Sequence, residues 1–65
     1  QVQARRDLAR YYVMTGAFAA AESQLQQARG MSTDFYEQSQ IDVQIKEVKD
    51  KLAEERQLLE RFKSG

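Results

Sequence analysis

The sequence contains no cysteine and no histidine among its 65 residues. Disulfide bonds and thiolate metal sites are therefore excluded, and the commonest metal ligand and general base of proteins is missing too. No proline interrupts the chain, and only three glycines are present. These absences count against catalysis, a cofactor or a metal in this segment, and they favour long helices.

An excess of charge of one sign is also absent. Ten Lys and Arg residues balance ten Asp and Glu residues, so the formal net charge is zero. Nucleic-acid-binding proteins carry a basic surface, so we expect no nucleic-acid partner. Because 31% of the residues are charged, no apolar run reaches the roughly 18 residues of a membrane-spanning helix. We therefore expect no membrane span.

Large apolar side chains are few. Eight of the 27 apolar residues are alanine, which leaves nineteen larger ones. A chain of this size builds only a small core, and neither a disulfide nor a thiolate metal site supplements it. The chain also begins with Gln1 rather than methionine. We therefore interpret the sequence as part of a larger protein, and as an interaction module that depends on partners.

Good helix formers dominate the composition, and strand-like alternation is absent. Gly16 and Gly30 are the only internal helix breakers, and we expect each to end a helix in the left-handed conformation. The fold class that follows is all-α, with a hairpin and one long helix. The three helices are expected at about 2–15, 17–29 and 35–62.

The third helix is expected to start at an N-cap, Asp34, with Glu37 completing a capping box three residues later. Its polar side chains are expected on an outer, solvated face; they are Gln38, Gln40, Gln44 and Lys49. Its N-terminal half is expected to pack across the hairpin through apolar residues; they are Phe35, Tyr36, Ile41, Ile45 and Val48. Residues 1–33 and 34–65 would then form one domain, with the long helix capping the hairpin.

The first two helices also match the tetratricopeptide repeat (TPR), a helical hairpin with fixed spacing of its seam residues. The matching residues are Leu8, Ala9, Tyr12, Gly16, Phe18, Ala21, Leu25 and Ala28. Arg5 stands where a large aromatic is usual and Thr33 where a closing proline is usual, which indicates a divergent or terminal repeat. The alternative is an ordinary helical hairpin with an alanine seam. Because one repeat cannot bury its apolar face alone, a TPR assignment implies packed neighbours.

The repeat and the segment after it contain a further set of characteristic residues: Tyr11-Tyr12, Asp34-Phe35-Tyr36, Ser39, Ile41-Asp42 and Glu47. In these residues the sequence resembles the C-terminal region of bacterial periplasmic zinc metalloproteases related to the β-barrel assembly-enhancing protease. In that family a catalytic domain with a His-Glu-x-x-His helix precedes the repeats. This sequence has no such motif, so no active-site residue carries over, and zinc is expected only upstream of Gln1. The resemblance implies a periplasmic, outer-membrane-associated protease whose repeats dock envelope proteins.

The first helix of a TPR lines the concave, partner-binding face. The residues turned away from the hairpin seam are expected to bind a protein or peptide; they are Gln3, Arg6, Arg10, Val13 and Met14. Arg6 and Arg10 lie one turn apart, so they would form a two-pronged cationic edge for an acidic peptide or a C-terminal carboxylate. The alternative is that both arginines are simply solvated.

The far end of the third helix extends past any hairpin of this length. Its apolar residues are expected to pair two copies in an antiparallel homodimer; they are Leu52, Leu58, Leu59 and Phe62. A solvated helical tail and a missing segment of the parent are the alternatives. For the whole chain, the second function considered is a stand-alone oligomerisation module. A catalytic role of its own is the least favoured.

Overall fold

A computed structural model describes residues 1–64, with Ser64 described by its backbone only; Gly65, the last residue of the predicted 34–65 region, lies outside the described residues. Residues 1–64 contain three α-helices and no strand, which confirms the all-α prediction. The helices are α1 (Val2–Met14), α2 (Phe18–Met31) and α3 (Phe35–Ser64).

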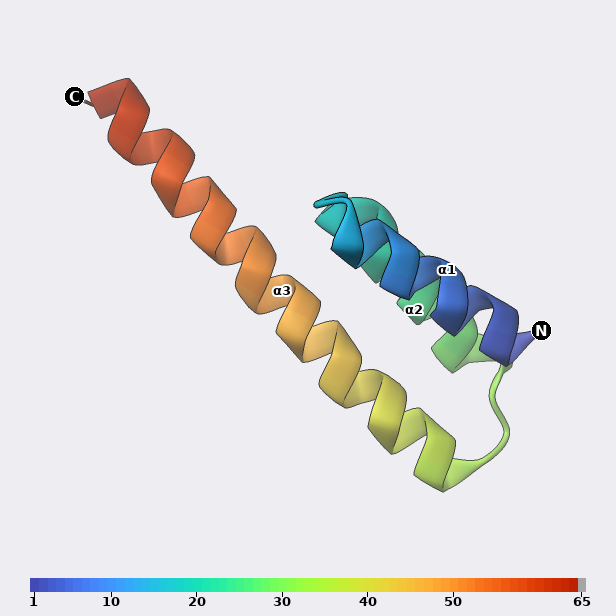
Figure 1. Cartoon of the computed structure of the whole chain (residues 1–65). Helices are drawn as coiled ribbons and strands as arrows, with labels where there is room; N and C mark the ends of the chain where they lie inside the picture. Colours follow the sequence, from blue (N-terminus) through green and yellow to red (C-terminus); the bar gives the residue numbers. More distant parts are fainter. Residues whose placement is uncertain (65) are drawn as a thin grey trace.

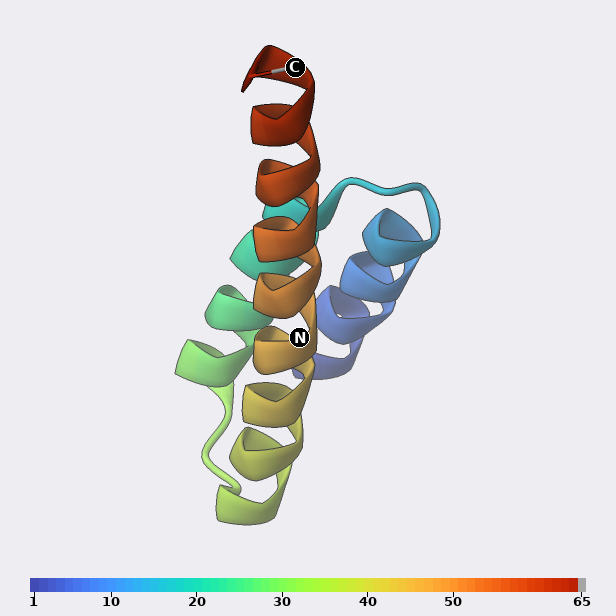
Figure 2. The same ribbon diagram turned by 90° about the vertical axis from the view of Figure 1, so that its left-hand side faces the viewer.

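α2 is the central helix of the molecule. It packs against both α1 and α3, whereas α1 and α3 have little direct contact. α1 and α2 form an antiparallel hairpin, and α3 returns along α2, parallel to α1 (Figures 1 and 2). The hairpin ends about midway along α3, so that the C-terminal part of α3 extends beyond it (Figure 1). The described chain is accordingly long and thin, with extents of 47 × 19 × 14 Å.

The turn between α1 and α2 confirms the role predicted for Gly16. This residue has a φ of +81°, a conformation that costs little only for glycine. Its N–H donates to the Val13 carbonyl at 3.1 Å, and the Ala17 N–H donates to the Tyr12 carbonyl at 2.8 Å. This pair of bonds satisfies the last carbonyls of α1 in a Schellman motif.

The same role predicted for Gly30 is wrong. α2 continues through Gly30 to Met31, and Ser32 ends it in an extended conformation with φ −78° and ψ 136°. The Ser32 hydroxyl is buried and donates to Glu37 Oε1 at 2.7 Å, while Gln38 Nε2 donates to the Ser32 carbonyl at 2.7 Å. Because α3 satisfies the polar groups of Ser32, α2 ends without a left-handed glycine.

Asp34 caps α3 as predicted, but the capping box is different. The Tyr36 N–H donates to Asp34 Oδ1 at 3.0 Å. In a capping box, Glu37 would accept the Asp34 N–H; instead that N–H donates to Ser32 Oγ at 3.3 Å, and Ser32 Oγ donates to Glu37. Ser32 therefore stands between the two groups and joins the end of α2 to the start of α3.

The core contains small and branched residues from all three helices: Ala9, Ala21, Leu25, Ala28, Ile41, Ile45 and Val48. Tyr12 packs against this core, as predicted for the seam. Leu8, which also matches the repeat pattern, is 39% exposed, and Tyr11 is 59% exposed. These side chains lie on a face of α1 that no other described helix covers.

The contact between α3 and the hairpin is narrower than predicted. Ile41, Ile45 and Val48 are buried, but Phe35 is 84% exposed and Tyr36 is 72% exposed. α3 begins beyond the end of α2 (Figure 1), so its first turn has no helix beside it. The prediction that Phe35 and Tyr36 pack on the hairpin is therefore wrong.

Polar contacts border the packed part of α3 on the α2 side. Arg29 of α2 binds Asp42 of α3 through Nε at 2.5 Å and Nη2 at 3.2 Å, both groups being exposed. The hydrogen bond and the charge of Asp42 raise the pKa of Arg29 above its ordinary value. Lys49 lies 3.9 Å from Glu22 further along the same interface. Because these pairs are largely exposed, they add little stability.

Candidate functional site: the groove between α1 and α3

A groove runs between α1 and α3, because these two helices pack on α2 rather than on each other. It has a volume of about 220 Å³ and is open to solvent. Its lining residues are Ala9, Arg10 and Val13 of α1, Leu25 of α2, and Gln44, Glu47, Val48 and Lys51 of α3. This set of residues is called the α1–α3 groove below.

The floor of the α1–α3 groove is apolar and tightly packed. Ala9, Leu25 and Val48 are 2%, 1% and 4% exposed, and they also belong to the core. Val13 stands beside them on α1 at 37% exposure. The groove can therefore receive an apolar side chain against a surface that is already ordered.

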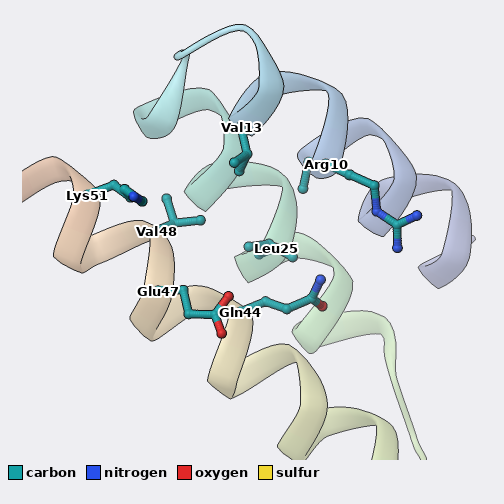
Figure 3. Close-up of a pocket in the computed structure, with 8 residues that line it drawn as sticks. Arg10, Val13, Leu25, Gln44, Glu47, Val48 and Lys51 are labelled. Atoms are coloured by element: carbon teal, nitrogen blue, oxygen red, sulfur yellow. The ribbon is translucent and has the colours of Figure 1, made fainter.

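Charged groups surround this floor. Figure 3 shows the Arg10 guanidinium and the Lys51 ammonium at opposite ends of the groove, with Glu47 and Gln44 along the α3 side. Arg10, Glu47 and Lys51 are exposed residues. The two cations and one carboxylate give the rim a positive balance. An extended or helical segment that carries acidic groups on both sides of an apolar residue would complement this arrangement.

Arg6 closes the groove at the N-terminal side of α1. Its Nε donates to Gln44 Oε1 of α3 at 3.0 Å, and both residues are half-buried. One N–H donor of Arg6 is thus used between the two helices, and the two-pronged edge of Arg6 and Arg10 stays a prediction. Gln44 was expected on an outer, solvated face, and that expectation is wrong, because Gln44 is half-buried and accepts this hydrogen bond.

The structure distributes the five residues predicted for the concave face over three positions. Arg10 and Val13 line the α1–α3 groove, and Arg6 closes its end. Gln3 and Met14 are not among the lining residues: the Gln3 side chain donates a hydrogen bond within α1, and Met14 is 79% exposed at the far end of that helix.

Sequence reasoning missed the contribution of α3 to this site. Four of the lining residues come from α3, and they share one helical face: Gln44, Glu47, Val48 and Lys51. Their spacing of three, one and three residues indicates one face of a helix. The prediction that the third helix caps the hairpin does not assign it a wall of a groove.

The far half of α3, residues 53–64, presents the second set of predicted contact residues. Leu58, Leu59 and Phe62 are 53%, 57% and 82% exposed; they are called the distal strip below. Leu52 differs from them, because it is half-buried and packs against the core. The predicted self-association surface is therefore split, with Leu52 belonging to the packed half of the helix.

Two further findings concern metal binding and membrane insertion. Within residues 1–64, no three His, Cys, Asp or Glu side chains gather in a way that could hold a metal ion. None of the helices in the described part of the chain combines the length and the apolar character needed to cross a membrane.

Comparisons with protein-family models, with curated proteins and with solved structures found no match to this chain.

Proposed function

We propose that this chain is a non-catalytic, TPR-type interaction module that holds a segment of a partner protein in the α1–α3 groove. The observation that carries the proposal is the groove itself: an apolar, ordered floor between two parallel helices, with a cation at each end. Its volume of about 220 Å³ lies below the range of roughly 300–1,000 Å³ typical of small-molecule pockets. A single apolar side chain with its flanking backbone suits this space better than a cofactor does.

The charges of the groove define the partner further. Arg10 and Lys51 favour acidic groups, and Glu47 offers one acceptor for a backbone N–H or a basic group. The partner segment is therefore a short peptide with a leucine, methionine or phenylalanine between acidic residues. A C-terminal carboxylate fits either end in the same way.

Binding of short synthetic peptides, followed by NMR chemical-shift changes, tests this function. A peptide with one leucine flanked by aspartates should perturb Val13, Val48 and Lys51, whereas the same peptide flanked by lysines should not. Lys51→Gln should weaken binding about tenfold, which corresponds to one charge-assisted contact. Lys46→Gln is the matched control, because Lys46 is also an exposed lysine of α3 and lies outside the groove.

The outcomes separate the proposal from its alternatives. Equal losses in Lys51→Gln and Lys46→Gln would mean that only the overall charge matters. Shifts confined to residues outside the α1–α3 groove would contradict the site. Either result would remove the support for a groove-based function.

The wider setting is proposed on the resemblance of residues alone. The module would belong to a periplasmic zinc metalloprotease related to the β-barrel assembly-enhancing protease, and it would dock substrates or assembly partners for a catalytic domain upstream. Support comes from the Asp34-Phe35-Tyr36 segment and the Tyr11-Tyr12 pair. A His-Glu-x-x-His motif in the coding sequence upstream of Gln1 is the expected finding. A start codon immediately before Gln1 would contradict this setting and leave the groove proposal standing.

A further inference from the structure

The distal strip is an unpartnered apolar surface on an isolated stretch of helix. Leu58, Leu59 and Phe62 are each more than half exposed, and α3 leaves the hairpin before it reaches them (Figure 1). Leu59 and Phe62 continue the spacing of three and four residues that buries Val48 and packs Leu52 on the core. The strip therefore has the form of a helix-packing surface without its second helix.

The charges around the strip indicate which second helix fits. Glu54, Glu55 and Arg56 precede the leucine pair with a net negative charge, whereas Glu60, Arg61 and Lys63 follow it with a net positive charge. A parallel pairing of two such segments would bring Glu55 of one copy against Glu55 of the other. An antiparallel pairing centred on Leu58 instead brings Glu55 opposite Arg61, and it does so twice by symmetry. The segment is thus complementary to itself in one direction only.

The end of α1 provides a second apolar contact in the same arrangement. Val13 and Lys51 line one cavity, so the C-terminal end of α1 lies beside this turn of α3. Met14, 79% exposed, follows Val13 there. In the antiparallel pairing centred on Leu58, Phe62 of the second copy lies opposite Glu54, roughly one turn beyond Lys51. Phe62 and Met14, two of the most exposed apolar side chains, would then approach each other.

We propose that the far half of α3 pairs antiparallel with the same segment of a second copy of this chain, with Leu58 at the two-fold axis. The distal strip forms the interface, and the two Glu55–Arg61 contacts set its direction. The interface lies outside the α1–α3 groove and does not depend on the function proposed for it. With only three apolar side chains per copy, the interface is small and the association is weak.

Sedimentation equilibrium of the 65-residue chain between ~10 µM and ~1 mM tests the pairing. The wild type should change from monomer to dimer over this range. Leu59→Lys should raise the dissociation constant at least tenfold. Val43→Lys is the matched control, because Val43 lies on the same helix at 59% exposure against 57% for Leu59. Far-UV circular dichroism confirms that both variants remain helical.

Disulfide trapping tests the direction, since the natural sequence has no cysteine. Leu58→Cys should form a disulfide-linked dimer under mild oxidation. Lys51→Cys lies two turns earlier on the same face; in the antiparallel pair its two copies are roughly 21 Å apart along the helix axis, too far for a disulfide. In a parallel pair both variants would cross-link.

Each alternative result overturns the proposal. A wild type that stays monomeric at ~1 mM would show that the distal strip does not bind a second copy of the chain. Equal weakening by Leu59→Lys and Val43→Lys shows unspecific association. A disulfide in Lys51→Cys, or none in Leu58→Cys, excludes antiparallel pairing at Leu58.

Discussion

The two halves of α3 carry apolar side chains at similar helical spacing, yet only one half is covered. In the near half, residues 35–52, Ile41, Ile45 and Val48 are 0%, 7% and 4% exposed. In the far half, residues 53–64, Leu59 is 57% exposed and Phe62 is 82% exposed. The same kind of pattern therefore builds a core in one place and an open surface in the other.

The difference comes from the length of the hairpin. α1 and α2 have 13 and 14 residues, whereas α3 has 30. At 1.5 Å per residue, the hairpin reaches ~21 Å and α3 reaches ~45 Å. Apolar spacing determines which face of a helix can pack against another element, and the length of the neighbouring element determines whether that face is buried. A long helix beside short ones therefore presents both outcomes in one molecule.

Truncation of one residue in each half gives the strongest test of this comparison. Ile41→Ala removes a fully buried side chain and should cost about 3 kcal/mol of unfolding free energy. Leu59→Ala should change stability by no more than ~0.5 kcal/mol, because its side chain is already in water and alanine favours helix. Urea unfolding followed by circular dichroism at ~10 µM measures both. A similar loss of unfolding free energy in the two variants would mean that the Leu59 side chain is buried against another surface in solution.

The start of the near half offers the next largest effect. Ser32 is 6% exposed, and its hydroxyl connects the Asp34 N–H to the Glu37 carboxylate. Ser32→Ala should cost about 1–2 kcal/mol, because it leaves these polar groups without their partner. The matched control is Ser39→Ala, whose exposed hydroxyl bonds only to the Phe35 carbonyl, and it should be neutral or slightly stabilising. Equal effects would show that the Ser32 network does not anchor α3.

Much of the fold could be predicted from the sequence, because it depends on local chemistry. The three helices, the left-handed Gly16, the Asp34 cap and the seam position of Tyr12 all follow from residue type and spacing. The end of α2 could not be predicted in this way. Gly30 has the right residue type, but the end is set by Ser32, which bonds to residues of the next helix.

The candidate site was only half predictable for the same reason. One wall of the α1–α3 groove lies on α1, where the predicted repeat pattern indicates Arg10 and Val13. The other wall depends on where α3 docks. Gln44 shows this most clearly, since it has the character of a solvated residue and yet accepts a hydrogen bond from Arg6 across the groove. A contact between two helices cannot be read from either helix alone.

Substitution of the two glycines tests where the helices of the hairpin end. Gly16 has a φ of +81° and open space around it, so Gly16→Ala should cost about 1 kcal/mol from backbone strain alone. Gly30 lies inside α2 with nothing within 4 Å of an added Cβ. Gly30→Ala should therefore stabilise the chain by about 0.5–1 kcal/mol. Thermal unfolding of the two variants should shift in opposite directions; a loss in both would mean that α2 ends at Gly30 after all.

The smallest effect is expected from the ion pair between Arg29 of α2 and Asp42 of the near half. Asp42→Asn removes the carboxylate that binds Arg29 across the α2–α3 interface. Because both groups are exposed, water and salt weaken the attraction. The loss of unfolding free energy should therefore be smaller than in Ile41→Ala, Ser32→Ala or Gly16→Ala. It should also disappear in roughly 1 M salt, where the screening length falls to about 3 Å. Asp50→Asn is the control, since Asp50 pairs with Lys46 on the same helix and joins no second element. A salt-dependent loss in Asp42→Asn alone would show that the near half is held in register by charge as well as by its core; equal losses in the two variants would show that any carboxylate on α3 has the same small effect.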